Sequence, residues 1–224
     1  MRTAIAPARP DTFDMLVVHN AFRTHFRALP DLVAGVDAGD AGRARQLAAF
    51  LDELCTGLHD HHTGEDELMW PLLLERAPIH AGSTLRMEEQ HERIAELVRR
   101  ARGEADEFGT AAAASARDRL ADTLRALTAA LDEHLAEEEH EALPVVEEVM
   151  TAEEWRALGE RGRAHMPRNR QLVFLGFLMQ TASESQRRKL LAEMPPAARL
   201  AWRLLGRRSF AREYRAIYGS DPDW

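Results

Sequence analysis

Two long segments of the chain carry apolar residues at alternating spacings of four and three positions. The first series comprises Leu47, Leu51, Leu54, Leu58, His61, Glu65, Leu68 and Leu72, and the second comprises Leu120, Leu124, Leu127, Leu131, His134, Glu138 and Val145. This spacing places each series on one face of an α-helix, as in a helical bundle. Each segment therefore predicts a long helix whose inward face carries a histidine and, four residues later, a glutamate.

The chain repeats this pattern as two halves. The stretch "LHDHHTGEDELMWP" at 58–71 aligns position by position with "LDEHLAEEEHEALP" at 131–144. The helical segments before them also correspond, with His19 in the first half equivalent to His91 in the second. The repeat predicts a duplicated helical hairpin, and thus an all-α fold with an up-down-up-down four-helix bundle over residues 10–150.

Breaks between the four helices are expected at 29–43, 75–84 and 103–115, where glycine, alanine, proline or serine are frequent. Ser83 or Thr84 is the expected N-cap of the third helix. Residues 151–224 are predicted to form a helical, basic extension that packs on the bundle. A capping box of Thr151 and Glu154 marks its start, and Gly206 is a candidate break within it.

Charge is unevenly distributed, with a formal −14 over residues 1–166 and +6 over 167–224. A basic tail can contact nucleic acid or membrane, but docking of the tail on the acidic bundle explains it more simply. We therefore expect neither a membrane nor a nucleic-acid partner, while a homodimer through the C-terminal helices stays open. The apolar block at 172–179 is too short to cross a bilayer, and Cys55 is the only cysteine. With no signal-peptide pattern at the N-terminus, a cytoplasmic protein is expected.

Polar groups are predicted on the buried faces of all four helices. They are His19, His61, Glu65, His91, His134 and Glu138. One buried histidine is commonly a hydrogen-bonded core residue. We call the inward, mostly apolar face of each helix its seam. An ionised glutamate in such a seam is unfavourable by several kcal/mol unless it is paired or binds metal. Imidazole together with carboxylate suits iron, manganese or zinc, so the pattern predicts a pair of transition-metal ions.

The other histidines are expected to lie away from this site. His25 points away from the seam, and His59 and His62 flank it, so we expect all three to be exposed. His59 or His62 could instead orient a ligand, and Glu141, one turn after Glu138, could be an extra ligand or mark the bundle end. The missing side chain of Gly64 either lets a small molecule enter past the helix or permits close helix packing.

The order H…HxxxE…H…HxxxE resembles the hemerythrin-like HHE cation-binding family across residues 10–150. The resemblance implies a non-haem di-iron centre, bridged by oxide or hydroxide, in which zinc or manganese are substitutes. By carry-over, His19 and His61 hold one iron and His91 and His134 the other. Glu65 and Glu138 would bridge the two irons.

One position departs from the oxygen-carrying hemerythrins, which have a fifth histidine through HxxxH on the third helix. Here Met87 and Ala95 flank His91 at that spacing, which implies two histidines per iron and an open, nearly symmetric centre. This four-histidine variant resembles bacterial hemerythrin-like proteins associated with peroxide and nitric oxide.

Three classes of function follow. The first is a di-iron protein that binds or reacts with peroxide, NO or O₂, with catalase-like activity undecided. The second is an iron- or oxygen-responsive sensor in which metal occupancy controls the C-terminal helices. The third is a structural bundle, with or without metal.

Overall fold

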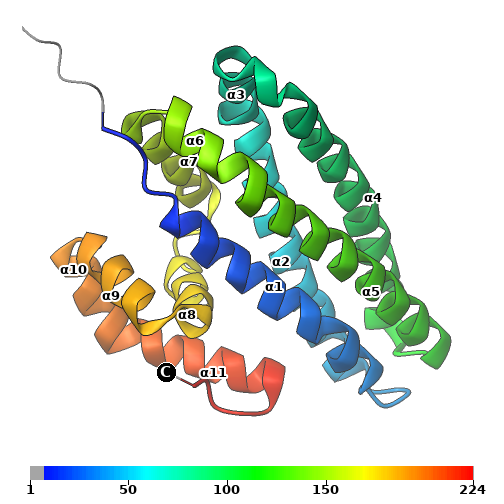
Figure 1. Ribbon diagram of the computed structural model, residues 1–224. Coiled ribbons are helices and arrows are strands. Elements are labelled where there is room, and N and C mark those ends of the chain that lie inside the picture. Colours follow the sequence, from blue (N-terminus) through cyan, green and yellow to red (C-terminus); the bar gives the residue numbers. More distant parts are fainter. Residues whose placement is uncertain (1–7, 224) are drawn as a thin grey trace, which may run out of the picture.

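The computed structural model describes residues 8–223, which are helical apart from short turns and contain no β-strand. Four long helices form a bundle: α1 (Phe13–Ala34), α2 (Ala41–Leu68), α4 (Ala81–Ala111) and α5 (Ala114–Glu137). Around the bundle, α4 lies between α2 and α5, and α1 contacts both α5 and α2 (Figure 1). The predicted fold class, an all-α helical bundle, is confirmed.

Apolar side chains fill the bundle in two separate clusters. The larger runs along its length and includes Phe26, Leu51, Ile94 and Leu127. The smaller closes one end of the bundle and is built around Met69, Trp70, Met87, Leu143 and Val146. Along α1 and α4, and where the chain passes from α2 into α3 and from α5 into α6, polar residues separate the two clusters, so a polar layer lies between two apolar layers.

Short helical segments form the closed end of the bundle. α3 (Trp70–Arg76) and the 3-10 turn η1 (Pro78–His80) follow α2, and the π-helical turn η2 (Glu138–Ala142) joins α5 to α6 (Leu143–Val149). Pro71 and Pro144 lie in the first turns of α3 and α6, where a missing amide hydrogen is tolerated.

Two of the expected helix boundaries are wrong. α4 already begins at Ala81, and the Ser83 and Thr84 hydroxyls donate to the carbonyl of His80 rather than capping the helix. α4 also continues to Ala111, so only residues 112–113 connect it to α5. The segment expected to be a break is rich in alanine, the residue with the highest helix propensity.

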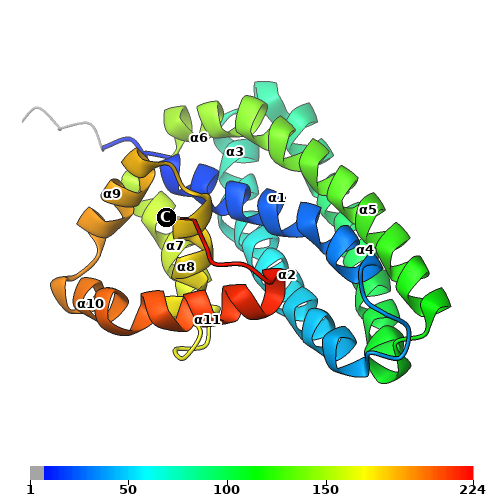
Figure 2. The same ribbon diagram turned by 90° about the horizontal axis from the view of Figure 1, so that it is seen from below.

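The extension lies against the first two bundle helices. It comprises α7 (Ala152–His165), α8 (Gln171–Thr181), α9 (Glu184–Glu193), α10 (Pro196–Ala201), the π-helical turn η3 (Trp202–Gly206) and α11 (Arg207–Tyr218). The Thr151–Glu154 capping box opens α7 as expected. α7 packs on α2, while α8 packs between α1 and α11 (Figures 1 and 2). Gly206 does not break the helix, because the chain passes through it as a π-helical turn. No helix among residues 8–223 combines the length and apolar character needed to cross a membrane.

Gly176 provides a test of how the extension docks. A Cβ at this position of α8 would lie 2.2 Å from Cγ of Phe210 on α11. We expect Gly176→Ala to lower the free energy of unfolding by about 1–3 kcal/mol, because the buried ring must move. Urea unfolding measures the change. The matched control is Gly162→Ala in α7, where a Cβ meets nothing within 4 Å. If Gly176→Ala unfolds like the wild type, α8 and α11 do not pack as described.

His25, expected to be exposed, is only 1% exposed. The extension covers it: the ring packs edge-on against Phe177, and Nδ1 lies 2.6 Å from the hydroxyl oxygen of Tyr218. The expectation considered α1 within the bundle alone, without the second layer that the extension adds. Burial lowers the pKa of His25 to about 4.

The lowered pKa of His25 predicts a pH-dependent stability. The unfolded chain has a histidine pKa of about 6.5, so protonation favours the unfolded state. The stabilisation by neutral His25 is complete above that pH and is lost as the pH falls toward 4. Between pH 7.5 and pH 4.5, the free energy of unfolding of the wild type is expected to fall by about 2.5 kcal/mol more than that of His25→Phe. Parallel pH profiles of unfolding for the two proteins would contradict this assignment.

Candidate metal centre

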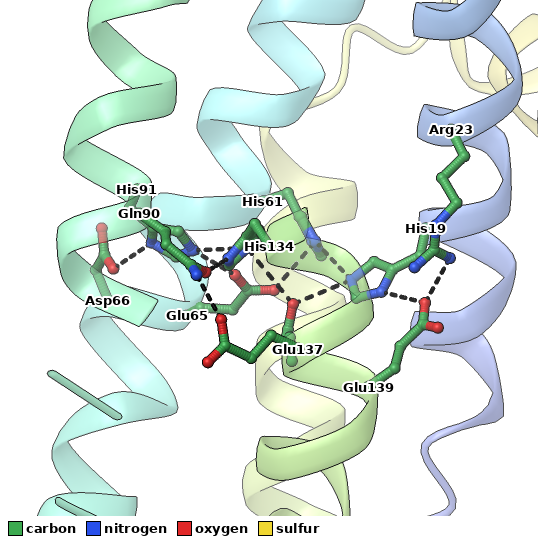
Figure 3. Close-up of polar contacts among 11 residues, drawn as sticks. His19, Arg23, His61, Glu65, Asp66, Gln90, His91, His134, Glu137 and Glu139 are labelled. Atoms are coloured by element: carbon green, nitrogen blue, oxygen red, sulfur yellow. Dashed lines mark hydrogen bonds and ion pairs between the residues drawn. The ribbon is translucent and has the colours of Figure 1, made fainter. Parts of the chain in front are cut away.

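All six sequence-predicted residues lie together in the polar layer of the bundle. His19 comes from α1, His61 and Glu65 from α2, His91 from α4 and His134 from α5 (Figure 3), while Glu138 begins η2. Five of them are buried, and His61 is 12% exposed at its side chain. The inward positions predicted from the helical spacing are therefore correct.

The histidines meet in two pairs through their Nε2 atoms. His19 and His61 approach to 3.2 Å, and His91 and His134 approach to the same distance. The pairing matches the two halves of the internal repeat, since each hairpin contributes one pair. Each pair thus directs two ring nitrogens toward a common point.

The two glutamates connect these pairs. Glu65 places one carboxylate oxygen 3.1 Å from His61 Nε2 and the other 3.5 Å from His91 Nε2. Glu138 Oε2 lies 3.3 Å from His19 Nε2 and 3.7 Å from His134 Nε2. Each carboxylate therefore lies beside one histidine of each pair, the position that a bridging ligand requires.

Two overlapping groups of donor atoms could each hold a metal ion, with all atoms of a group within 4.8 Å of one another. One group consists of His19, His61, Glu65 and Glu138; the other consists of His62, Glu65, His91 and His134. Glu65 belongs to both groups, so two ions placed there would share it.

His62 is the residue that the helical spacing missed. Its expected exposure is wrong: it is 6% exposed, and its ring stacks on His91 with centroids 3.9 Å apart and planes at 7°. A residue next to the seam is rotated by about 100° toward a neighbouring helix. Here that neighbour is α4, which packs closely on α2 and carries His91. The sequence feature that could have identified His62 is its position directly after His61.

His62 adds a fifth histidine to the four that the sequence analysis placed in this layer. The polar layer holds five histidines: His19 and His61 belong to one donor group, and His62, His91 and His134 belong to the other. This fifth histidine comes from α2, whereas the fifth histidine of the oxygen-carrying hemerythrins is on the third helix, where this chain has only His91. The centre is consequently less symmetric than the sequence implies.

Outer hydrogen bonds orient three of the rings. Nδ1 of His19 lies 2.9 Å from Glu139, which Arg23 also contacts, and Nδ1 of His91 lies 2.8 Å from Asp66 (Figure 3). His134 Nδ1 lies 3.0 Å from the Gln90 side-chain oxygen. The acceptors at Nδ1 favour the tautomer that carries its proton there and turns the Nε2 lone pair inward, as a metal ligand needs.

The carboxylates lack hydrogen-bond partners. Glu65 and Glu138 are fully buried, and none of their four oxygens accepts a hydrogen bond. Burial raises the pKa of Glu65 well above its usual value, helped by the Glu138 charge, and burial also raises the pKa of Glu138. Buried carboxylates without donors are unfavourable as anions unless a cation neutralises them.

Burial favours the neutral form of three of the imidazoles. Burial lowers the pKa of His61 and His62 well below the usual value and that of His134 to about 2. The contacts of these histidines with the glutamates are therefore not ion pairs, although their distances would allow it. Neutral imidazole nitrogens and unpartnered carboxylate oxygens are the donor set that a divalent transition metal binds, so the residues fit such an ion.

Other candidates lie outside the centre. Glu141 pairs with Arg86 at the bundle end, and His59 is exposed. Cys55 is buried elsewhere in the core, and burial raises the pKa of its thiol to about 12. At Gly64 a Cβ would lie 3.0 Å from Leu158 of α7, so this glycine permits close helix packing.

Comparison with known proteins agrees with this geometry. The search of curated proteins and the search of solved structures gave no match. The family model of the hemerythrin HHE cation binding domain matches residues 13–146, which include all four bundle helices and the seven residues of the polar layer. The chain belongs to the hemerythrin HHE cation-binding domain family.

Proposed function

We propose that the chain is a di-iron protein that binds or reacts with a small molecule such as peroxide, NO or O₂. The observation that carries this proposal is the position of Glu65. Its buried carboxylate belongs to both donor groups, and neither of its oxygens accepts a hydrogen bond. Two divalent ions would satisfy both oxygens and hold the carboxylate ionised. Zinc and manganese suit the same ligand types, so the choice of iron rests on family membership.

The protein environment suits a metal pair that reacts with small molecules. A bound iron pair supplies one-electron chemistry toward such small molecules. The chain itself excludes water, since an apolar cluster lies on each side of the polar layer. Glu139, Asp66 and Gln90 fix the ring orientations.

Peroxide consumption by iron-loaded protein tests the reaction. We expect wild-type protein to consume peroxide, and Glu65→Gln and His134→Ala each to reduce the rate to that of free ferrous ion. NO binding, followed by visible absorption, is measured in parallel on the same samples. If peroxide consumption and NO binding are both absent in fully iron-loaded wild type, or survive both substitutions, the reactive-centre proposal fails.

A sensor role is the second candidate, because the extension touches the helix turn that bears the ligands. Arg161 of α7 donates to the carbonyl of Asp60 at 3.2 Å and pairs with Glu67 at 2.8 Å, on either side of His61 and Glu65. A change in metal occupancy at this turn would therefore reach α7 directly. Proteolysis of residues 151–224 that differs between metal-free, ferrous and ferric protein would favour this role, and identical proteolysis would exclude it.

A further inference from the structure

Leucines gather on the outer side of the last long helix. Leu200, Leu204 and Leu205 are 56%, 58% and 65% exposed, and they are three of the five exposed large hydrophobic side chains among residues 8–223. Trp202 and Phe210 on the same helical run are buried. The packed side of this run is thus already occupied by tryptophan and phenylalanine, and the leucines contribute nothing to that packing.

Arginines surround these leucines. Arg199, Arg203, Arg208 and Arg212 are exposed, and within the described part of the chain no ion pair to an acidic side chain involves them. Other arginines of the extension do pair: Arg170 with Glu213, Arg188 with Glu184 and Arg215 with Asp221. Docking on the acidic bundle therefore does not neutralise these four charges.

We call these seven residues the basic leucine face. They lie on α10, η3 and the start of α11, which follow one another as a nearly continuous helix along one edge of the molecule (Figure 2). Leu200 and Leu204 are one turn apart, so they project from similar sides of that helix. The run therefore presents apolar and cationic side chains together, over the part of its circumference that the buried Trp202 and Phe210 do not occupy.

We propose that the basic leucine face docks on the surface of an anionic lipid bilayer. A helix that presents leucine together with arginine binds the interface by inserting the apolar groups and attracting the lipid phosphates. The formal charge supports one orientation: residues 1–166 carry −14 and 167–224 carry +6, so an anionic surface attracts the extension and repels the bundle. The contact is peripheral and independent of the metal centre.

Two other occupants fit this face less well. Nucleic acid would use the arginines, but the exposed leucines would remain in water and offer no stacking platform. A second copy related by a two-fold axis would bring the same four arginines against each other without acidic partners. The membrane alone uses both kinds of side chain. The expectation of no membrane partner rested on docking of the tail on the acidic bundle, and these four arginines form no ion pair with an acidic side chain of the described residues.

Vesicle co-sedimentation of the full-length protein tests the proposal. Vesicles of phosphatidylcholine with about one quarter phosphatidylglycerol are compared with pure phosphatidylcholine, at about 0.1 M salt. We expect binding to the anionic vesicles alone, with release when the salt is raised to about 0.5 M. The Leu200→Ser, Leu204→Ser, Leu205→Ser triple variant and the Arg203→Glu, Arg208→Glu double variant are each expected to bind at least about tenfold more weakly.

Matched substitutions on the bundle provide the controls. Leu85→Ser removes a leucine of similar exposure, and the Arg119→Glu, Arg125→Glu double variant makes the same change in net charge on the bundle. Both are expected to bind vesicles like the wild type. Circular dichroism and metal content check that each variant is folded. No binding, equal binding to both vesicle types, or unchanged binding by the two face variants overturns the proposal. So does a dimer in light scattering that either face variant converts to monomer.

Discussion

Glu65→Gln is expected to abolish the paired binding of two metal ions and, at the same time, to stabilise the metal-free protein. Glutamine keeps the size of the side chain but cannot bridge two cations as a carboxylate does. Metal content should therefore fall from two ions per chain to about one or none. The loss follows from the position of Glu65, which is the donor common to both groups.

The gain in metal-free stability has a separate cause. Without a cation, both Glu65 oxygens are buried without a hydrogen-bond donor, and burial disfavours the anion. A glutamine amide can donate to His61 Nε2, which lies 3.1 Å from Glu65 Oε1. We expect the free energy of unfolding of the metal-free variant to rise by about 1–3 kcal/mol at pH 7, measured in urea with chelator present.

Glu67→Gln is the matched control for both effects. Glu67 lies on the same helix two residues later but is exposed and paired with Arg161 at the surface. It should keep both ions and change stability by less than about 1 kcal/mol. A Glu65→Gln protein that still binds two ions with wild-type affinity would show that Glu65 is a core residue and not a shared ligand.

His62→Phe is expected to weaken the binding of one of the two ions and leave the other near its wild-type affinity. Phenylalanine can still stack on His91, as His62 does at 3.9 Å, but it removes the unpartnered Nε2 from the His62 group. Mutation of a residue that only hydrogen-bonds to a metal ligand weakens metal affinity about 10–100-fold. Removal of a ligand itself should therefore lower the affinity at least about tenfold. Stepwise metal titration by calorimetry resolves the two sites.

The control for this prediction is His59→Phe, which removes a nearby exposed histidine of the same helix. It should leave both binding steps unchanged. If His62→Phe titrates like the wild type, the stacking on His91 is only packing, and the centre has four histidines as the sequence resemblance implied.

The seam of each helix could be predicted from the sequence, and with it the six residues of the centre. Helical spacing is a property of one helix and needs no knowledge of its neighbours. The repeat then supplied the correspondence between the halves, because His61 and His134 occupy equivalent positions. Both inferences depend only on local order along the chain.

The flanks of the helices could not be predicted in this way. Whether a residue beside the seam is buried depends on which helix covers it, and no spacing within one helix carries that information. His62 is covered by α4, and His25 is covered by the extension through Phe177. Asp66, Gln90 and Glu139 likewise contact histidines of the polar layer only through tertiary packing.

Helix boundaries were uncertain for a different reason. The alanines at 111–114 are compatible with helix or turn, and the chain resolves this with a left-handed residue, Ala112 at φ 49°, that ends α4. The packing of α4 against α5 requires this short connection, and therefore determines where α4 ends.

Anaerobic titration of metal-free, full-length protein with ferrous iron, followed by elemental analysis after desalting, tests the central claim most directly. The account predicts two irons per chain for the wild type and at most one for the Glu65→Gln, Glu138→Gln double variant, whose folded state is checked by circular dichroism. No retained iron in the wild type, or two irons retained by the double variant, would contradict a centre built on these buried glutamates.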